Sequence, residues 1–151
     1  GALNRRSFLS YAENEFVRAC RYKRNLAIAF IDIDHFKKIN DTRGHSAGDL
    51  VIKELAKNIM SLLRENDYFC RWGGEEFIIL CPQTNKNGVL KMAESLRLKI
   101  AHNDFANAGT LTASFGVSIY GKDETMEAFI KRVDDALYEA KDTGRNSVKF
   151  H

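Results

Sequence analysis

Acidic residues stand at two places in this sequence where carboxylates could meet at the edge of a sheet. Asp32 follows the apolar run 26–31, and Glu75 directly follows the pair Gly73 and Gly74. Carboxylate oxygens are ligands that Mg²⁺ prefers, and a catalytic Mg²⁺ site commonly combines one or two carboxylates with substrate phosphates. The two glycines would let a phosphate approach the backbone without meeting a Cβ atom. These residues therefore indicate metal-assisted phosphate chemistry with Asp32 and Glu75 as metal ligands.

A simpler interpretation is that these carboxylates are solvated ends of strands. It applies equally to Asp32, Asp34, Glu75 and Glu76, and Asp34 is also placed to cap the turn that follows it. Because successive side chains of a strand point to opposite faces, Glu75 and Glu76 should not face the same metal unless the hairpin twists sharply. The sequence alone leaves the choice between Glu75 and Glu76 open.

Other kinds of metal or redox site are excluded by spacing. Counted from Asp32, the sixth position of an EF-hand loop would be Lys37 instead of the required glycine. The three cysteines, Cys20, Cys70 and Cys81, form no C-x-x-C pair and no Cys/His cluster. We expect them to be reduced, buried thiols.

The first half of the chain contains the elements that must position the acidic residues. Apolar spacing predicts a helix over 7–22, capped by Ser7, and the run 26–31 is typical of a central strand that is buried on both faces. A helical turn over 35–39 is broken at Gly44, after which a long helix should end near Arg64.

The second half begins with a predicted hairpin. Strand-like runs at 68–72 and 76–80 flank Gly73 and Gly74, which we expect to adopt positive φ in a tight turn. The remaining predicted elements are a helix through 89–100, a strand over 110–120, a helix through 129–140 closed by Gly144 as its C-cap, and a short strand over 147–150.

Size and composition predict one domain and argue against a general nucleic-acid-binding role. The chain has 151 residues, of which 44% are hydrophobic, and a net charge of +3 without a long run of Lys or Arg. Its longest apolar run, 26–31, has the length of a strand and is far shorter than a membrane span. The start at Gly1 has no signal-like pattern, so we expect 1–151 to be the C-terminal output domain of a longer, regulated protein.

Several motifs in order along the chain resemble the GGDEF (GGEEF) diguanylate cyclase family. The signature itself is Gly73-Gly74-Glu75-Glu76-Phe77. Further matches occur at 4–8 (NRRSF), 32–41 (DIDHFKKIND), 44–49 (GHSAGD), 114–118 (SFGVS) and 140–146 (AKDTGRN). Because these motifs cover essentially the whole chain, they favour functional carboxylates over solvated strand ends.

The resemblance implies a fold, a reaction and a cofactor. The fold would be α/β and palm-like, with a central five-stranded, mixed and mainly antiparallel sheet surrounded by helices. The reaction would condense two GTP molecules into cyclic di-GMP and two pyrophosphates at the interface of a homodimer. Each half-site would bind one GTP and two Mg²⁺ ions, with Mn²⁺ able to replace Mg²⁺.

The family also implies roles at the metal site. Asp32 and Glu75 would bind the metal, and the carbonyl of Ile33 would be a backbone ligand. Glu76 would be a further catalytic acidic group, either as a metal ligand or as a base.

Guanine recognition would fall to Asn40 and Asp49, with Phe36 also in the substrate site. A carboxylate can accept hydrogen bonds from the guanine edge, which adenine lacks, so the resemblance predicts a preference for GTP over ATP. Two simpler roles stay open. Asn40 could cap the C-terminus of a helix, and Asp49 could be an acidic residue in the first turn of a helix.

Lys37, Lys141 and Arg145 match positions that hold the triphosphate, next to the turn formed by Gly73 and Gly74. Isolated lysines on helices are usually solvated, so only the motif context favours binding. Arg145 could also lie near a helix C-terminus for electrostatic reasons alone.

A product-binding inhibitory site would lie upstream of the signature. Arg64 and Asp67 form an R-x-x-D motif, and five residues separate Asp67 from Gly73. A guanidinium group and a carboxylate suit the phosphates and guanine edges of cyclic di-GMP, although helix ends often pair Arg and Asp without any ligand. A further basic partner could come from Lys91, Ser95 or Arg97, and the sequence does not decide among them.

Two other functions deserve comparison with a cyclase. The domain could be a catalytically silent receptor for GTP or cyclic di-GMP, against which the intact signature argues. A palm-like nucleic-acid-binding domain is disfavoured by the lack of a basic cluster. GTP use implies a cytoplasmic location for this domain, even if the full-length protein is membrane-anchored.

Overall fold

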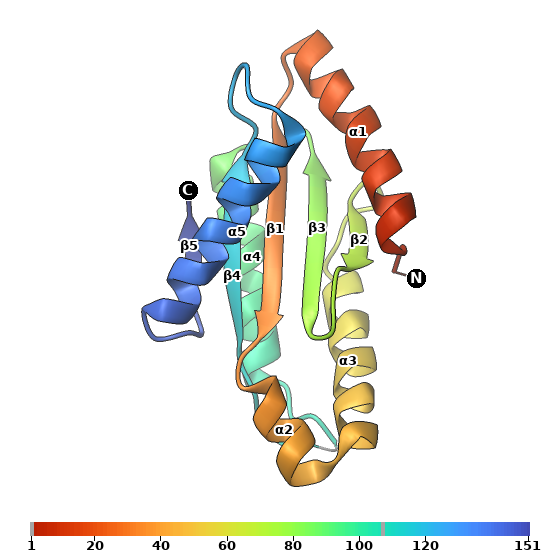
Figure 1. Ribbon diagram of the computed structural model, residues 1–151, viewed down its shortest axis with the longest axis vertical. Helices are drawn as coiled ribbons and strands as arrows, with labels where there is room; N and C mark the ends of the chain where they lie inside the picture. Colours follow the sequence, from red (N-terminus) through yellow and green to blue (C-terminus); the bar gives the residue numbers. More distant parts are fainter. Residues whose placement is uncertain (1, 107) are drawn as a thin grey trace.

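The computed structural model describes residues 2–106 and 108–151. A five-stranded sheet forms the middle layer, and helices cover both of its faces (Figure 1). In chain order the elements are α1 (Arg5–Tyr22), β1 (Leu26–Ile33), α2 (Phe36–Arg43), α3 (His45–Met60), β2 (Tyr68–Arg71), β3 (Glu76–Pro82), α4 (Lys86–His102), β4 (Ala113–Ile119), α5 (Met126–Asp142) and β5 (Val148–Phe150).

β1 is the central strand of the sheet, whose order is β2-β3-β1-β4-β5. It pairs in antiparallel fashion with β3 and β4, β2 pairs antiparallel with β3, and β4 pairs in parallel with β5. The predicted α/β fold with a five-stranded, mixed and mainly antiparallel sheet is therefore confirmed. The pairing brings the C-terminal end of β1 beside the β2–β3 turn, at the lower end of the sheet in Figure 1.

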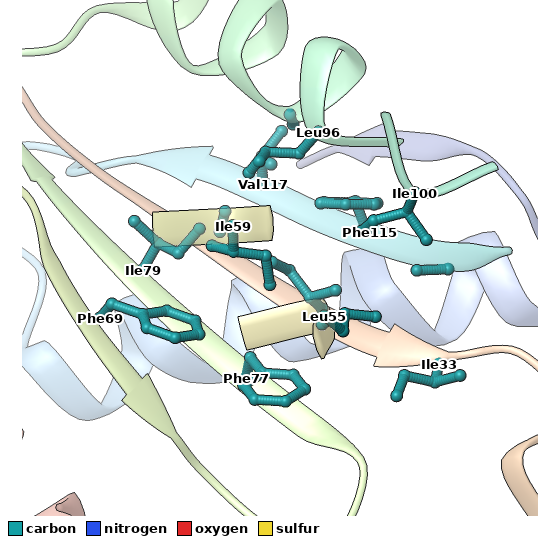
Figure 2. Close-up of a cluster of buried hydrophobic side chains, with 14 of the residues drawn as sticks. Ile33, Leu55, Ile59, Phe69, Phe77, Ile79, Leu96, Ile100, Phe115 and Val117 are labelled. Atoms are coloured by element: carbon teal, nitrogen blue, oxygen red, sulfur yellow. The ribbon is translucent and has the colours of Figure 1, made fainter. Parts of the chain in front are cut away.

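Every residue of β1 is buried because both faces of the sheet are covered. Side chains from Ala27 to Ile33, taken at alternate positions, pack against α3 and α4 in one core cluster. The intervening side chains from Leu26 to Phe30 pack against α1 and α5 in the other. Figure 2 shows part of the first cluster, in which Leu55 and Ile59 of α3 lie over side chains of the sheet. Burying a large apolar side chain of this kind contributes roughly 1.5–3 kcal/mol.

Helix α5 approaches the sheet most closely at Gly116 of β4. A Cβ atom on Gly116 would lie 2.8 Å from Leu137 Cα and closer still to the Val133 carbonyl oxygen and the Leu137 amide nitrogen. The absence of a side chain therefore allows the helix backbone to rest directly on the strand.

The first helix begins earlier than its apolar spacing predicts. α1 starts at Arg5, and Asn4 is its N-cap, with Asn4 Oδ1 accepting a hydrogen bond from the Ser7 amide at 2.8 Å. The prediction that Ser7 caps this helix is wrong. Asn4 has the extended backbone of a cap and an acceptor side chain, which leaves Ser7 inside the first turn.

Other element boundaries differ modestly from the predictions. α2 continues to Arg43, α3 ends at Met60 instead of near Arg64, and β4 begins at Ala113 instead of 110. The C-cap of α5 is Thr143, so the prediction of Gly144 as the cap is wrong by one residue. Gly144 follows the cap with φ of 112°, a conformation that glycine adopts without strain.

The three thiols are free, as predicted, but they are not all buried. Cys70 and Cys81 lie in the core, whereas Cys20 is exposed on α1. The expectation of burial is wrong for Cys20 because it lies on the outer side of an amphipathic helix whose buried side contains Phe8, Ala12 and Ala19. Among the residues that the structure describes, no helix combines the length and apolar character needed to cross a membrane.

Candidate functional site

Acidic side chains gather where β1 ends beside the β2–β3 turn. Asp32 of β1 pairs in register with Glu76, the first residue of β3. The Ile33 amide donates a hydrogen bond to the Glu75 carbonyl oxygen at 3.3 Å, which joins the turn to the end of β1. The structure thus brings together Asp32, Ile33, Glu75 and Glu76, which the sequence separates by more than forty residues.

Asp32 is a buried carboxylate, with 3% of its surface exposed. Burial raises its pKa to about 6, the Lys141 ammonium opposes that rise, and the negative charges of Glu75 and Glu76 add to it. Lys141 Nζ donates to Asp32 Oδ2 at 2.9 Å from the last turn of α5. The site therefore has more negative charge than its neighbouring cation offsets.

Glu75 and Glu76 both act electrostatically on Asp32 although they are adjacent in sequence. β3 begins at Glu76, and Glu75 belongs to the turn that precedes it. The alternation of side chains along a strand therefore does not apply between the two residues. Glu76 shares a sheet face with Ile78 and Leu80, which is the face covered by α1 and α5.

The turn at Gly73 and Gly74 does not use positive φ, so that prediction is wrong. Arg71 instead closes the turn, with Nε donating to the carbonyl oxygens of Gly73 at 3.2 Å and Gly74 at 3.0 Å. A Cβ atom on Gly74 would meet nothing within 4 Å, and one on Gly73 would meet Glu76 Oε2 at 3.1 Å. Packing and backbone conformation therefore do not require glycine at position 74. The open space beside Gly74 would allow a ligand to approach the backbone.

Asp34 does not cap the helix that follows, so that alternative is wrong. The N-cap of α2 is His35, and Asp34 accepts hydrogen bonds from Thr112 Oγ1 at 2.7 Å, Ser114 Oγ at 2.6 Å and the Asn146 amide at 3.0 Å. This buried carboxylate ties β1 to β4 and to the loop after α5. Its role is structural support for the site, while Asp32 faces the acidic cluster.

Phe36 and Asn40 of α2 lie against Gly48 of α3. A Cβ atom on Gly48 would overlap Asn40 Oδ1 and lie 3.1 Å from Phe36 Cζ. Asn40 Oδ1 is buried and has no hydrogen-bond partner within the described part of the chain. Because an unpaired buried acceptor is costly, this oxygen is suited to accept from a ligand.

The two simpler roles considered for Asn40 and Asp49 are wrong. Asn40 lies within α2, whose C-cap is Gly44, and Asp49 lies beyond the first turn of α3, which contains no acidic residue. Asp49 is exposed on α3, directly after Gly48. Neither residue is explained by helix capping.

The three predicted triphosphate cations differ in their positions. Lys141 contacts Asp32 directly, whereas Lys37 is exposed on the first turn of α2. Arg145 is exposed in the loop between α5 and β5, with φ of 61°. Lys141 is therefore the cation that the folded chain brings to the acidic cluster, and Lys37 and Arg145 lie on segments that adjoin it.

The donor atoms at this strand end suit a hard divalent cation. Within residues 2–106 and 108–151, no group of three acidic, His or Cys side chains is arranged to hold a metal by itself. Mg²⁺ needs fewer protein ligands when substrate phosphates and water complete its shell. The carboxylates of Asp32 and Glu75, the backbone of Ile33 and the excess negative charge around Asp32 therefore fit Mg²⁺.

Arg64 and Asp67 form a second polar site, at the start of β2. Arg64 Nη2 donates to Asp67 Oδ1 at 3.1 Å, to the Pro82 carbonyl oxygen at 3.1 Å and to Thr84 Oγ1 at 2.5 Å. A cavity of about 400 Å³ beside them is also lined by Lys91 and Ser95 of α4. Arg97 lies elsewhere, bonded to Glu94 and Asn146. Lys91 is thus the basic residue that the structure adds to Arg64.

Sequence reasoning missed several residues that support these sites. Arg71 closes the turn beside the acidic cluster, and Gly48 makes room for Asn40. Arg5 stacks its guanidinium over Trp72 at 3.9 Å, which holds the start of α1 on the hairpin. Arg71 adjoins the signature and Gly48 lies inside a matched motif, but their contacts depend on how the elements pack.

Comparison with protein families matches residues 1–147 to the family described as "Diguanylate cyclase, GGDEF domain". Among curated proteins, the chain is 40% identical over 148 residues to diguanylate cyclase DgcM of Escherichia coli strain K12. That alignment covers 98% of this chain and 36% of DgcM. The chain spans between 23% and 36% of the length of curated relatives such as these.

Solved structures show the same fold. The GGDEF domain of DgcB from Caulobacter crescentus, in complex with c-di-GMP, has a TM-score of 0.94 and 30% identity, covering 99% of this chain and 91% of that one. The active GGEEF domain of a diguanylate cyclase from Vibrio cholerae has a TM-score of 0.94 and 36% identity, covering 99% of this chain and 97% of that one. The similarity therefore extends over the whole sheet and its helices.

Proposed function

This chain belongs to the diguanylate cyclase GGDEF domain family, and on that premise we propose that it condenses two GTP molecules into cyclic di-GMP and two pyrophosphates. The observation that carries the proposal is the cluster of Asp32, Glu75 and Glu76 with Lys141, at the strand end beside the Gly73–Gly74 turn. Acidic metal ligands, a cation and an accessible backbone together suit a bound nucleoside triphosphate.

We assign the metal site to the carboxylates of Asp32 and Glu75 and the carbonyl of Ile33, with two Mg²⁺ ions as the resident cofactor and Mn²⁺ able to replace them. When bound, Mg²⁺ lowers the pKa of the attacking hydroxyl, polarises the phosphoryl oxygen and stabilises the leaving group. The buried position of Asp32 supports this assignment, because a carboxylate surrounded by other carboxylates gains from a cation.

The triphosphate would lie between the hairpin turn and the cations. Gly73 and Gly74 would bind phosphate oxygens through the turn backbone, which the open space around Gly74 supports. Lys37, Lys141 and Arg145 would offset the negative charge of the phosphates. On this assignment Lys141 changes partner on substrate binding, from Asp32 alone to a phosphate beside Asp32. Glu76 would accept a proton or add a further metal ligand, and its register pairing with Asp32 on the neighbouring strand supports that role.

The guanine base would bind between α2 and α3. Asn40 Oδ1 is a buried acceptor without a partner among the described residues, and Phe36 lies beside it against Gly48. Asn40 and Asp49 would accept hydrogen bonds from the N1 and N2 donors of guanine, which adenine does not present in the same pattern. The site should consequently prefer GTP over ATP.

Each chain would supply half of the reaction site, so turnover requires a homodimer. In the dimer each 3′-hydroxyl oxygen attacks the α-phosphorus of the opposite GTP. One P–O bond forms, the bond to the pyrophosphate leaving group breaks, and the hydroxyl proton passes to a base such as Glu76 or to water. Two such steps close the ring and release two pyrophosphates.

Product feedback would act through the second polar site. The cavity beside Arg64 and Asp67 combines a guanidinium, a carboxylate and the ammonium of Lys91, which suits phosphate and guanine groups of cyclic di-GMP. The solved structure of the DgcB GGDEF domain, which has the same fold, contains c-di-GMP, and this supports product binding by the present chain. Lys91 would then provide the basic partner that the sequence left undecided.

The family context supports a place for this domain in a longer, regulated protein. Curated relatives such as DgcM are nearly three times as long as the aligned region, consistent with an additional sensory or regulatory part. We propose that residues 1–151 are an output domain of that kind. Its use of GTP would place it on the cytoplasmic side.

The proposal is tested by incubating concentrated protein with GTP and Mg²⁺ and separating the products by chromatography. Cyclic di-GMP and pyrophosphate should form in a 1:2 ratio, EDTA should stop the reaction, and Glu75→Ala should be silent. Asp135→Ala, which removes an exposed carboxylate that pairs with Lys131, should remain active. The specific rate should rise with protein concentration because two chains must meet. Silence of the wild type combined with tight cyclic di-GMP binding would instead identify a receptor.

A further inference from the structure

The loop that carries Arg145 has an unusual backbone. Gly144, Arg145 and Asn146 are consecutive residues with positive φ, at 112°, 61° and 42°. This conformation is uncommon for residues other than glycine and persists where surrounding structure holds it. The loop is the tight connection at the lower end of α5 in Figure 1.

Backbone groups anchor this loop on three sides. The Arg145 amide donates to the Ala140 carbonyl oxygen at 2.9 Å, and the Asn146 amide donates to Asp34 Oδ2 at 3.0 Å. The Phe115 amide donates to the Ser147 carbonyl oxygen at 2.9 Å. These bonds fix where the loop leaves α5 and where it joins β5, and they need no particular side chain at position 146.

One side chain from a different helix adds a fourth anchor. Arg97 Nη1 of α4 donates to Asn146 Oδ1 at 2.8 Å, across 49 residues of sequence. Arg97 is itself held by Glu94, through Nε to Oε2 at 3.0 Å and a second bond from Nη2 to Oε1. Only 17% of the Arg97 side chain is exposed, against 46% for Glu94, and Asn146 is exposed on the loop.

The position of this anchor matters because Asn146 is the immediate neighbour of Arg145. Asparagine tolerates left-handed φ, so the backbone shape alone does not require Arg97. The hydrogen bond from Arg97 of α4 to the Asn146 side chain instead restrains the position of the loop. The two bonds to Glu94 also fix the direction in which the Arg97 guanidinium points toward Asn146.

We propose that Arg97 is a positioning residue for nucleotide binding. Through Asn146 it holds the left-handed loop so that Arg145 stays beside the triphosphate. This inference rests on the proposed function, in which Arg145 contacts the nucleotide. Arg97 itself touches neither the substrate nor the acidic cluster.

The test measures steady-state kinetics and binding of a non-reacting GTP analogue for the wild-type chain and six variants. Arg97→Ala removes the donor, and Asn146→Gly removes the acceptor while keeping a residue that accepts left-handed φ. Each should raise KM and the analogue Kd about three- to tenfold, as expected for one hydrogen bond, with a smaller change in kcat. Combining the two should be no worse than either alone, because both remove the same bond.

The decisive comparison is made in an Arg145→Ala background. If Arg97 acts through Arg145, adding Arg97→Ala to Arg145→Ala should change KM less than twofold. An undiminished effect of Arg97→Ala in that background would overturn the proposal, as would wild-type KM in both single variants. Lys99→Ala is the matched control, since Lys99 lies on the same helix but donates to Ser61 Oγ on the opposite flank.

Failure of the inference is distinguishable from failure of the proposed function. A wild-type chain that neither binds the analogue nor forms product contradicts the proposed function. A wild-type chain that does both, with Arg97 variants indistinguishable from it, contradicts only the positioning role. Thermal denaturation of every variant separates a loss of affinity from a loss of folding.

Discussion

Lys141 Nζ lies 2.9 Å from Asp32 Oδ2, so the last turn of α5 is joined to the end of the central strand across 109 residues of sequence. Asp32 is almost completely buried, whereas about a third of the Lys141 side chain is exposed. The pair places a partly exposed cation at the rim of a buried acidic site. On the proposed function, this ammonium would contact a substrate phosphate beside Asp32.

Removing the charge of Lys141 should impair catalysis more than folding. We expect Lys141→Gln to lower kcat/KM for GTP by roughly 10²-fold, as for loss of one electrostatic contact to a reacting phosphate. Pyrophosphate release gives the rate, and Lys131→Gln on the exposed side of the same helix serves as the control. Wild-type kinetics in Lys141→Gln would remove this residue from the site.

Gly48→Ala should weaken GTP binding by disturbing the guanine pocket. The added Cβ would displace Asn40 Oδ1 and crowd Phe36, so KM should rise roughly tenfold, which corresponds to about 1.4 kcal/mol. The change in kcat should be small, because Asn40 and Phe36 would contact the base and not the reacting phosphates. Ser46→Ala, an exposed substitution in the same helix, should retain the wild-type KM. Equal KM values for the two variants would argue against a base pocket here.

Substitution by alanine should change the stability of the fold very differently at Gly116 and Gly74, because the space around the two glycines differs. Gly116→Ala forces a methyl group into the backbone of α5 and should destabilise the fold by about 3 kcal/mol, lowering Tm by roughly 6–12 °C. Gly74→Ala meets nothing within 4 Å and should change stability by less than about 0.5 kcal/mol. The Gly74→Ala variant should nevertheless lose GTP affinity. Calorimetry and GTP titration of both proteins check the contrast, which a stable Gly116→Ala protein would contradict.

The cysteines should label in a defined order. Burial raises the pKa of the Cys81 thiol and also that of Cys70, so neither forms thiolate readily, and both are shielded by the core. Cys20 is exposed and should react first with a maleimide at pH 7.5. Mass spectrometry should find one label in the native protein and three after unfolding in guanidinium. Early labelling of Cys81 would indicate a core more open than the structure shows.

Product binding should depend on Arg64 and Lys91 but not on Arg97. Loss of a charge-assisted hydrogen bond costs about 1.5–3 kcal/mol, so Arg64→Ala should weaken cyclic di-GMP binding by roughly 10- to 100-fold. Lys91→Ala should have a smaller effect in the same direction, because it lines the cavity beside Arg64. Isothermal titration with cyclic di-GMP measures both, with Arg97→Ala as the control. A loss of product affinity in Arg97→Ala would show that the cavity extends further along α4.

Much of the fold and the identity of the acidic site could be predicted from the sequence, because both depend on local patterns. The continuous apolar run before Asp32 marks a strand buried on both faces, and two strand-like runs around Gly73 and Gly74 mark a hairpin. Residue types suited to metal and phosphate stand at the ends of these elements. Capping was less predictable, as Asn4 and Thr143 show, because a cap depends on the backbone conformation of one residue.

Only the tertiary structure decided how these residues meet. Strand register puts Glu76 opposite Asp32, helix packing brings Lys141 to Asp32, and the same packing turns Asp34 into an acceptor for Asn146. Helix packing also gives Lys91 and Arg97 different surroundings. Lys91 lines the cavity beside Arg64, whereas Arg97 donates a hydrogen bond to Asn146. Lys91 and Arg97 are six residues apart on α4 and can serve different sites, because residues at that spacing do not share the face that positions three or four apart share. Sequence periodicity identifies the buried side of a helix. Which residues its other side chains contact depends on how elements distant in the sequence pack against it.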